Sequence, residues 1–438
     1  AYSWRHANWQ GRPWHEAVIY ELHVGAMGGY AEVEKHLPRL AELGVTAIEL
    51  MPLAQFPGER NWGYDGVLPY APQSSYGSPE QLKHLIDSAH EHGLAVILDV
   101  VYNHFGPDGN YLGQYAKGFF QEDVHTPWGA GIDFERREVR NFFLDNALMW
   151  LLEYRFDGLR LDAVHAIDNP GFLQELAHRV RQQSDIGRHV WLVLENELNQ
   201  ASLLKEDFDA QWNDDFHNVL HVLLTGETDA YYSDFAQDPT AKLARCLGEG
   251  FIYQGHTTRH GHERGEPSGE LPPTAFVSFL QNHDQIGNRA LGERLHQLCS
   301  PQALEAATAL LLLSPMIPLM FMGDEFAAEQ PFLFFTSHHG ELAELVREGR
   351  RNEFAAFSAF TDPHKREQIP DPNAESTFHA SQPRLSGSGT PLQQQTQELY
   401  RQLLKLRHQY IIPNLSGTQA LGAQLLGHGA VSARWRLG

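Results

Sequence analysis

The chain is short of cysteine, of positive charge and of long apolar runs, and each shortage excludes a class of protein. Only two cysteines, Cys246 and Cys299, occur among 438 residues. They are too few for a disulfide framework, and their spacing matches no zinc motif. We therefore expect two reduced thiols in a cytoplasmic protein. No stretch approaches the roughly 20 consecutive apolar residues of a membrane span, so no membrane partner is expected.

Positive charge is scarce, with 33 Lys+Arg against 55 Asp+Glu and a formal net charge of −22. Such a surface repels nucleic acid and anionic lipid, so neither is an expected partner. Aromatic residues are abundant by contrast, with 24 Phe, 15 Tyr and 9 Trp, many of them in Gly/Asp/Asn-rich loops. Exposed rings beside carboxylates and amides suit a polyhydroxylated ligand, because the C–H faces of a sugar stack on aromatic rings.

Short apolar runs alternate with amphipathic segments along most of the chain. Eight of these runs read as strands, at residues 18–22, 46–50, 94–100, 158–162, 190–194, 211–212, 276–280 and 317–321. Most lack polar alternation, as strands do in parallel sheets that are covered on both faces. Eight strand-helix units over about 320 residues predict an α/β fold, a (β/α)8 barrel with loop insertions.

Three regions follow from this pattern. Residues 1–16 read as an N-terminal linker, and residues 17–396 as the barrel, with an excursion at about 105–132 and an exposed loop at about 253–273. Residues 397–438 read as a C-terminal helix, expected over 399–409, and the opening strands of a β domain. A helix is expected over 32–43, and a linker or mobile loop over the Pro/Ser/Gly-rich residues 369–391. The flanking domains are expected to be cut back at both ends.

Polar residues follow several predicted strands, where a barrel of this kind carries its chemistry. Three carboxylates, Asp162, Glu195 and Asp284, lie at or just after the apolar runs of separate strands. One strand-end acid would most often be a helix cap or turn former. Three at one rim, with histidine and arginine around them, indicate a catalytic site.

At these positions the sequence resembles the α-amylase superfamily of glycoside hydrolases and transglycosylases. The matching segments are 99–104 (DVVYNH), 158–165 (GLRLDAVH), 194–196 (LEN) and 279–284 (FLQNHD), in the order and spacing of that family. The resemblance implies that Asp162 is the nucleophile, Glu195 the general acid/base and Asp284 the carboxylate that orients the sugar ring. Glu197 competes for the acid role, but Glu195 directly follows Leu194, where the acid of the family lies.

The same resemblance implies a set of substrate-binding residues. Arg160 would hold Asp162 ionised, and His104 and His283 would bind hydroxyls of the sugar being cleaved. Tyr64, followed by Asp65 in an exposed loop, matches the stacking tyrosine of the family, and His165 follows the nucleophile at the same strand end. Glycosidic cleavage by a retaining enzyme needs a proton donor and an opposing carboxylate about 5–5.5 Å apart, and Glu195 and Asp162 would supply this pair.

Within the superfamily the chain is most similar to the maltooligosyltrehalose trehalohydrolase family, as the segments 211–217 (QWNDDFH) and 331–335 (PFLFF) show. That family hydrolyses the α-1,4 bond next to a terminal trehalose unit. Trp212, Asp214, Asp215 and His217 are candidates for binding the trehalose leaving group, although capping of the next helix explains Asp214 and Asp215 equally well.

Two other functions stay open on the sequence. A glycogen branching enzyme or another α-glucan transglycosylase would use the same covalent intermediate, and a glycan-binding relative would keep the barrel without catalysis. Asn103 resembles a residue that contributes to a calcium site in many amylases, but the excursion at 105–132 lacks an acidic cage, so neither a metal nor a cofactor is expected.

Overall fold

A computed structural model describes residues 1–183 and 187–438. Eight parallel strands form a closed barrel in the order β1-β14-β13-β10-β9-β8-β5-β2. Their bounds are β1 Ile19–Leu22, β2 Ala47–Leu50, β5 Ala95–Val100, β8 Gly158–Leu161, β9 Trp191–Leu194, β10 Ala210–Trp212, β13 Phe276–Phe279 and β14 Ile317–Phe321. All eight predicted strands are present, so the predicted (β/α)8 class is confirmed.

The strands form because their residues are mostly apolar and lack a regular polar alternation. Every residue of β2, β5, β8 and β9 is buried, as expected for strands that are covered on both faces. In register, Leu50 pairs with Leu98, Leu98 with Leu159 and Leu161 with Leu194. The few polar residues in these strands therefore have to find partners in the interior.

Helices cover the strands. They are α1 Tyr30–Glu34, α2 Leu37–Leu43, α3 Pro79–Glu91, α4 Leu112–Tyr115, α5 Arg137–Leu148, α6 Pro170–Gln183, α7 Asp214–Thr225, α8 Pro239–Glu249, α9 His283–Gly287, α10 Pro301–Leu313, α11 Gly340–Glu353, α12 Pro363–Arg366, α13 Glu375–Ala380 and α14 Pro391–Leu406. The single helix predicted over 32–43 is wrong in one respect: it is broken between α1 and α2. Pro38 lacks an N–H to bond the preceding turn, so the chain starts a new helix around it.

The chain divides into two compact units. The first comprises Ala1–Ala17, Leu22–Glu197 and Lys205–Gln211. It holds β2, β5, β8 and β9 together with two antiparallel pairs, β3 Ala54–Gln55 with β4 Leu68–Pro72 and β6 Phe120–Thr126 with β7 Gly129–Ile132.

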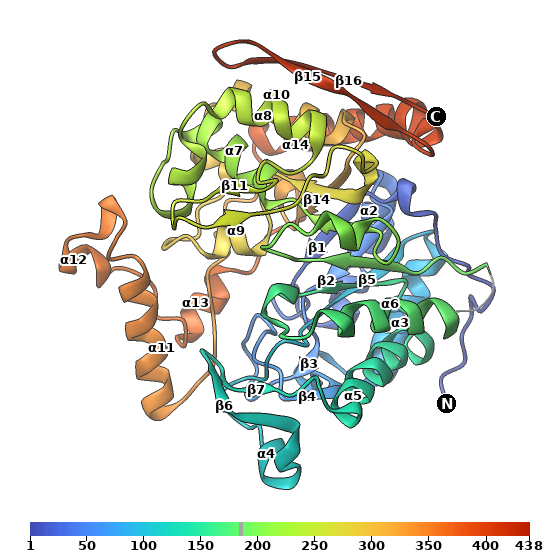
Figure 1. Cartoon of the computed structure of the whole chain (residues 1–438), viewed down its shortest axis with the longest axis vertical. Helices are drawn as coiled ribbons and strands as arrows, with labels where there is room; N and C mark the ends of the chain where they lie inside the picture. The colour runs from blue at the N-terminus through green and yellow to red at the C-terminus, as the bar shows by residue number, and fades with distance from the viewer. Residues whose placement is uncertain (184–186) are drawn as a thin grey trace. The chain divides into compact units, whose positions relative to one another are not determined.

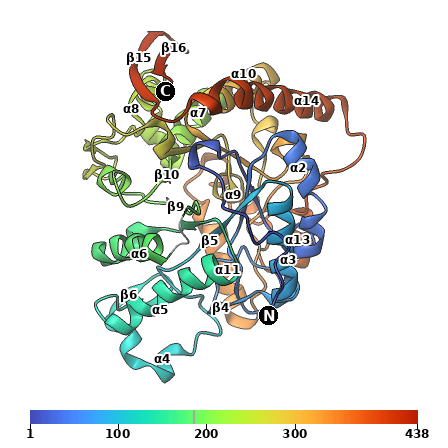
Figure 2. The ribbon, with the colours of Figure 1, turned by 90° about the vertical axis from the view of Figure 1, so that its right-hand side faces the viewer.

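The predicted excursion is the segment that carries α4 and the β6–β7 hairpin (Figure 2). Phenylalanine rings anchor it to the first unit, with centroids 5.8 Å apart for Phe105 and Phe119 and 5.9 Å apart for Phe119 and Phe143. These buried rings fix the base of the excursion to the first unit.

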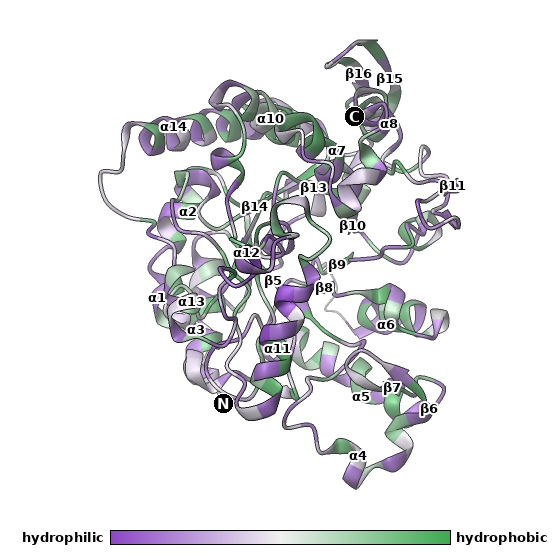
Figure 3. Cartoon of the chain, turned by 90° about the vertical axis from the view of Figure 1, so that its left-hand side faces the viewer, coloured by the Kyte–Doolittle hydropathy of each residue, from purple (hydrophilic) through white to green (hydrophobic). Residues whose placement is uncertain are grey.

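The second unit comprises Val18–Glu21, Leu198–Leu204 and Trp212–Gly438. Within it α10 and α14 lie side by side, and Figure 3 shows α10 as largely hydrophobic and α11 as largely hydrophilic. The C-terminal strands β15 Gln419–Gly427 and β16 Ala430–Arg436 form an antiparallel hairpin that packs on α8 (Figure 1). The strand pattern predicted at the end of the chain is this hairpin.

Two predicted loops contain regular structure. Residues 253–273 include the short hairpin of β11 His256–Thr257 and β12 Glu263–Arg264. The predicted linker at 369–391 contains α13, and α14 begins at Pro391, eight residues before the helix expected from 399. The Thr390 hydroxyl accepts a hydrogen bond from the backbone N–H of Gln393, and the Gln393 side-chain oxygen accepts one from the backbone N–H of Thr390, which fixes this start. In the described part of the chain, no helix has the length and apolar character needed to cross a membrane.

Candidate active site

A single buried arginine in the first unit contacts three carboxylates. Arg160, on β8, is wholly buried, and its Nη1 lies 2.9 Å from Oδ1 of Asp99 and 2.9 Å from Oδ1 of Asp162. Its Nη2 lies 3.0 Å from Oε2 of Glu195. Carboxylates that follow or end β5, β8 and β9 thus meet on one guanidinium group.

This arrangement has a clear electrostatic consequence. Burial by itself would lower the pKa of Arg160, but Asp99, Glu195, Tyr64 and Asp162 together raise it well above its ordinary value. The guanidinium group therefore stays charged and compensates carboxylates that would be costly to bury alone. The fixed positive charge also favours the ionised form of Asp162, as a nucleophilic carboxylate requires.

Asp162 is held from a second side by Asn103. The side-chain Nδ2 of Asn103 lies 3.0 Å from the carbonyl oxygen of Asp162 and 3.3 Å from its Oδ2. The Asp162 side chain is 13% exposed, in contrast to that of Arg160, which is fully covered. Asn103 therefore orients the Asp162 carboxylate.

Glu195 is fixed through the backbone. Its Oε2 accepts a 2.9 Å hydrogen bond from the N–H of Ala163, which has a φ of 42° in the left-handed region. The other glutamate of the motif lies differently: the Glu197 side chain is 68% exposed and its Oε2 lies 3.4 Å from Nε2 of His165. The structure thus joins Glu195, and not Glu197, to the Arg160 cluster. His165 pairs with Glu197 at the exposed edge.

The loop after β2 contributes Tyr64. Gly63 precedes it with a φ of 105°, and a Cβ atom there would lie 2.3 Å from the carbonyl oxygen of Pro52, so only glycine fits. The tyrosine hydroxyl donates a 2.5 Å hydrogen bond to Oδ2 of Asp99, which supports the acid that Arg160 also binds. Asp65 accepts a 2.6 Å bond from Asn61 and stabilises the same loop.

His104 connects this loop to the excursion. Its Nε2 lies 2.8 Å from the carbonyl oxygen of Tyr64, and its Nδ1 lies 2.5 Å from Oδ1 of Asn103. Both ring nitrogens thus contact protein groups, which favours a supporting role over the hydroxyl binding that we expected. The indole of Trp128 stacks on this ring, with centroids 4.2 Å apart and planes 14° apart.

Trp128 is the residue that the sequence analysis missed. It lies in the turn between β6 and β7 and is 43% exposed, so one face of the indole covers His104 and the side chain also reaches solvent. The aromatic content of the excursion pointed to a ligand in general terms, but no motif singled out this ring.

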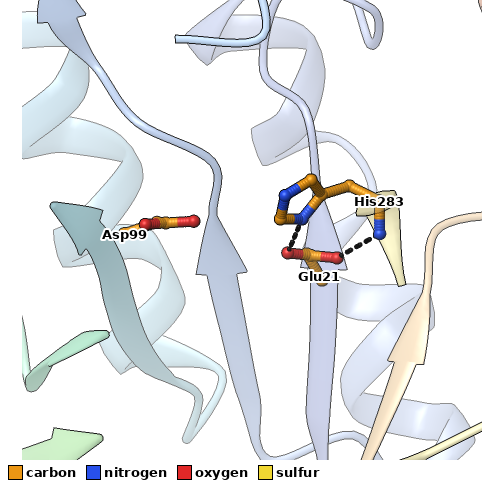
Figure 4. A group of neighbouring side chains, drawn as sticks. All are labelled: Glu21, Asp99 and His283. Atoms are coloured by element: carbon orange, nitrogen blue, oxygen red, sulfur yellow. Dashed lines mark hydrogen bonds and ion pairs between the residues drawn. The ribbon is translucent and has the colours of Figure 1, made fainter. Parts of the chain in front are cut away.

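In the second unit, His283 and Asp284 begin α9 directly after β13. The His283 ring is buried, with its Nδ1 2.7 Å from Oε2 of Glu21 (Figure 4). Its Nε2 lies 3.3 Å from Oδ1 of Asp284. Burial opposes the charged imidazole, but Asp284 and Glu21 together raise the pKa of His283 well above its ordinary value. The two carboxylates therefore favour the imidazolium form of His283.

The predicted leaving-group residues have structural partners in the second unit. Asp215 is buried, and its Oδ2 accepts hydrogen bonds of 2.8 Å from Ile252 N and 3.1 Å from Tyr253 N. It anchors residues 252–253, so the structure favours neither sugar contact nor simple capping for this acid.

His217 and Trp212 are buried as well. The Nδ1 of His217 lies 2.5 Å from the Leu280 carbonyl oxygen, its Nε2 lies 2.9 Å from the Tyr232 hydroxyl, and burial lowers its pKa well below the ordinary value. Trp212 is 1% exposed and packs on Phe279, with the ring centroids 5.6 Å apart. The burial of these two side chains argues against direct substrate contact. Asp214 is partly exposed in the first turn of α7.

Comparison with known proteins gives concordant results. The family description "Alpha amylase, catalytic domain" matches residues 4–128. A protein from Deinococcus radiodurans named malto-oligosyltrehalose trehalohydrolase is 44% identical over 93% of this chain and 68% of its own length. One of the same name from Saccharolobus solfataricus is 42% identical over 90% of this chain and 69% of its own length. A 1.4 Å crystal structure of a Salmonella typhimurium protein assigned to the alpha amylases superposes with a TM-score of 0.94 at 46% identity, covering 100% of this chain and 76% of that chain.

Proposed function

The chain belongs to the malto-oligosyltrehalose trehalohydrolase family of alpha-amylase-type glycoside hydrolases, and from this we propose that it releases trehalose from maltooligosyltrehalose. Its substrate is an α-glucan, and the bond cleaved is the α-1,4 bond next to the terminal trehalose unit. The observation that carries the proposal is the Arg160 cluster, in which one guanidinium group holds both Asp162 and Glu195. We infer a retaining double displacement at these two carboxyls.

In the first step, a carboxylate oxygen of Asp162 attacks the anomeric carbon and the bond to the leaving oxygen breaks. The protonated carboxyl of Glu195 gives its proton to that oxygen, so trehalose leaves as a neutral molecule. We assign the transferred proton to Oε1, because Oε2 is held by Ala163 N and by Arg160. The ion pair with Arg160 keeps Asp162 in the ionised form that attack requires.

In the second step, Glu195 takes a proton from a water molecule, whose oxygen attacks the anomeric carbon and releases Asp162. The maltooligosaccharide leaves with its α configuration retained, and Glu195 is again protonated. Asp284 is the third acid of the motif and follows β13. In a closed parallel barrel the carboxyl ends of the strands share one face, which supports its assignment to orienting the sugar ring.

Trp128 supplies the aromatic surface that a sugar substrate needs. One face of its indole stacks on His104, whose ring is in turn hydrogen-bonded to the Tyr64 carbonyl oxygen. This support gives the indole a fixed orientation in which a sugar can stack on it. Stacking of C–H faces on such a ring fixes a sugar without fixing its hydroxyl pattern. We assign to Trp128 a binding role for the glucan or trehalose portion, in place of the buried Trp212 and His217.

The test is a product assay with two substrates of matched length. The protein is incubated with maltooligosyltrehalose and, separately, with the maltooligosaccharide that lacks the trehalose end, and the products are separated by chromatography. We expect trehalose from the first substrate and much slower cleavage of the second. Glucans of altered branching without trehalose would replace the proposal by a transglycosylase, and binding without any product would replace it by a glycan-binding protein.

The stereochemistry is checked on the same reaction. NMR of the freshly formed reducing end should show the α anomer first, before mutarotation. Initial appearance of the β anomer would contradict a covalent intermediate on Asp162.

A further inference from the structure

A second carboxylate supports the histidine that precedes Asp284. Glu21 ends up wholly buried on β1, and both of its oxygens contact residue 283. Its Oε1 accepts a 2.9 Å hydrogen bond from the backbone N–H of His283, and its Oε2 accepts a 2.7 Å bond from Nδ1 (Figure 4). This two-point contact fixes both the backbone and the ring of one residue.

The other ring nitrogen of His283, Nε2, contacts the more exposed carboxylate of Asp284. Nε2 of His283 lies 3.3 Å from Oδ1 of Asp284, whose side chain is 31% exposed. Glu21, His283 and Asp284 therefore form a chain from a fully buried carboxylate to one that solvent and substrate can reach. Because Nδ1–H donates its hydrogen bond to Glu21, a further N–H at Nε2 exists only while the imidazole is protonated.

We propose that Glu21 is a positioning residue of the active site, which holds His283 in one orientation and as an imidazolium so that Nε2–H faces Asp284. The proposal rests on the proposed function, in which Asp284 orients the sugar ring. Glu21 itself does not touch substrate, since it is buried behind His283. In the second unit, the charged groups that act on the imidazole are Glu21 and Asp284. Figure 4 also draws Asp99, from β5.

Loss of the Glu21 charge has a specific consequence. In Glu21→Gln the amide oxygen can still accept the His283 backbone N–H, but the amide nitrogen then faces Nδ1 as a donor. Nδ1 becomes an acceptor, and the ring loses the neighbouring negative charge that favours its protonated form. The geometry of α9 is retained, whereas the charge and tautomer of His283 change.

The matched control is Glu325→Gln. Glu325 is also buried in the second unit, where its Oε1 accepts bonds from the Tyr20 hydroxyl at 3.2 Å and from Gly323 N at 2.9 Å. Each variant removes one buried carboxylate. Glu21 lies in β1, and Glu325 lies in the turn that follows β14, the strand paired with β1. Of the two glutamates, only Glu21 contacts His283. A general loss of stability would affect both variants alike.

The experiment combines NMR of the full chain, labelled at histidine, with kinetics. The His283 signal is assigned by its absence in a His283→Gln variant. We expect the wild type and Glu325→Gln to keep His283 protonated between pH 5 and 8, and Glu21→Gln to titrate within that range. We also expect kcat/KM of Glu21→Gln to fall by about tenfold to a hundredfold, with a larger loss at pH 8 than at pH 6.

A third variant keeps the proposal falsifiable should Glu21→Gln not fold. Glu21→Asp retains the charge on a shorter side chain, so we expect His283 to stay protonated while kcat falls. An unchanged His283 titration in Glu21→Gln, or an equal loss of activity in Glu325→Gln, would overturn the proposal. The NMR measurement needs no substrate, so a wild type that releases no trehalose refutes the proposed function without deciding the role of Glu21.

Discussion

The backbone N–H of Ala163 donates a 2.9 Å hydrogen bond to Oε2 of Glu195. Ala163 directly follows Asp162, so the residue that carries one reactive carboxyl also positions the other. Its φ of 42° places an alanine in a backbone region that L-residues rarely adopt. Strain of this kind persists where the surrounding structure imposes it, and here it lies between the two groups that have to act together.

Substitution at Ala163 should separate strain from function. Ala163→Gly removes the Cβ atom but keeps the N–H, so we expect the free energy of unfolding to rise by up to about 1 kcal/mol and kcat to stay near that of the wild type. Ala163→Val places a β-branched side chain in the same backbone region and should lower the free energy of unfolding by about 2 kcal/mol or more, with loss of activity. Urea unfolding and initial rates check both. Equal stability of the two variants would contradict the assigned strain.

The two glutamates of the third motif give a sharp test of the catalytic assignment. Glu195→Gln removes the proton donor and should lower turnover on the order of 10² to 10⁴-fold. Asp162→Asn removes the nucleophile and should lose at least as much. Glu197→Gln changes an exposed side chain outside the Arg160 cluster, so we expect its rate within about twofold of the wild type.

Circular dichroism and thermal unfolding establish that these three variants fold. A rate for Glu195→Gln near that of the wild type, together with an inactive Glu197→Gln, would move the acid role to Glu197.

Removal of the exposed indole should weaken substrate binding. Trp128→Ala deletes the stacking surface over His104, and we expect KM to rise about tenfold, which corresponds to about 1.4 kcal/mol, with a smaller change in kcat. Tyr115→Ala is the matched control, because Tyr115 is an aromatic residue of the same excursion and is 86% exposed. Steady-state kinetics with maltooligosyltrehalose measure both. A KM that rises equally in the two variants would point to disorder of the excursion instead.

Asp324 predicts how stability depends on pH. Burial raises its pKa from 3.8 to about 7, in spite of Arg294 nearby and hydrogen bonds from Phe321 N and Gln281. An acid whose pKa rises on folding stabilises the fold while it is protonated. This contribution is complete below about pH 4 and is lost as the pH rises to about 7, by up to about 4 kcal/mol.

Asp324→Asn has the shape of the protonated acid and does not titrate. We therefore expect the variant to gain stability relative to the wild type between pH 4 and 7, and this difference to level off above pH 7. Urea unfolding at several pH values measures it, with the exposed Asp168→Asn as control. Parallel pH profiles for the wild type and Asp324→Asn would show that Asp324 titrates normally.

The sequence was informative wherever one local pattern determines the structure. The eight strands could be predicted because their runs are mostly apolar and lack a regular polar alternation, and the Arg160 cluster could be anticipated because its members lie at or near the ends of such runs. The break between α1 and α2 could have been predicted from Pro38, since proline disfavours a helical conformation in the residue before it. The start of α14 could also have been predicted, because Thr390 and Gln393 have the types and spacing of a capping box.

Contacts between distant segments could not be predicted in the same way. Trp128 reaches His104 only through the β6–β7 hairpin, and Glu21 reaches His283 across 262 positions of sequence. His217 looked like a rim residue, but the Tyr232 hydroxyl and the Leu280 carbonyl oxygen occupy its two nitrogens. No periodicity or short motif records which polar side chain turns inward to bond the backbone.

The shared guanidinium group of Arg160 also determines how substitutions combine. Asp99, Asp162 and Glu195 all draw on one cation, so removal of any one of them changes the field that acts on the other two. In a double-mutant cycle the effects of Asp99→Asn and Glu195→Gln should therefore deviate from additivity, although Asp99 lies in β5 and Glu195 follows β9. A substitution at Asp99 should therefore change the reactivity of Glu195. We expect the two positions to vary together among functional variants.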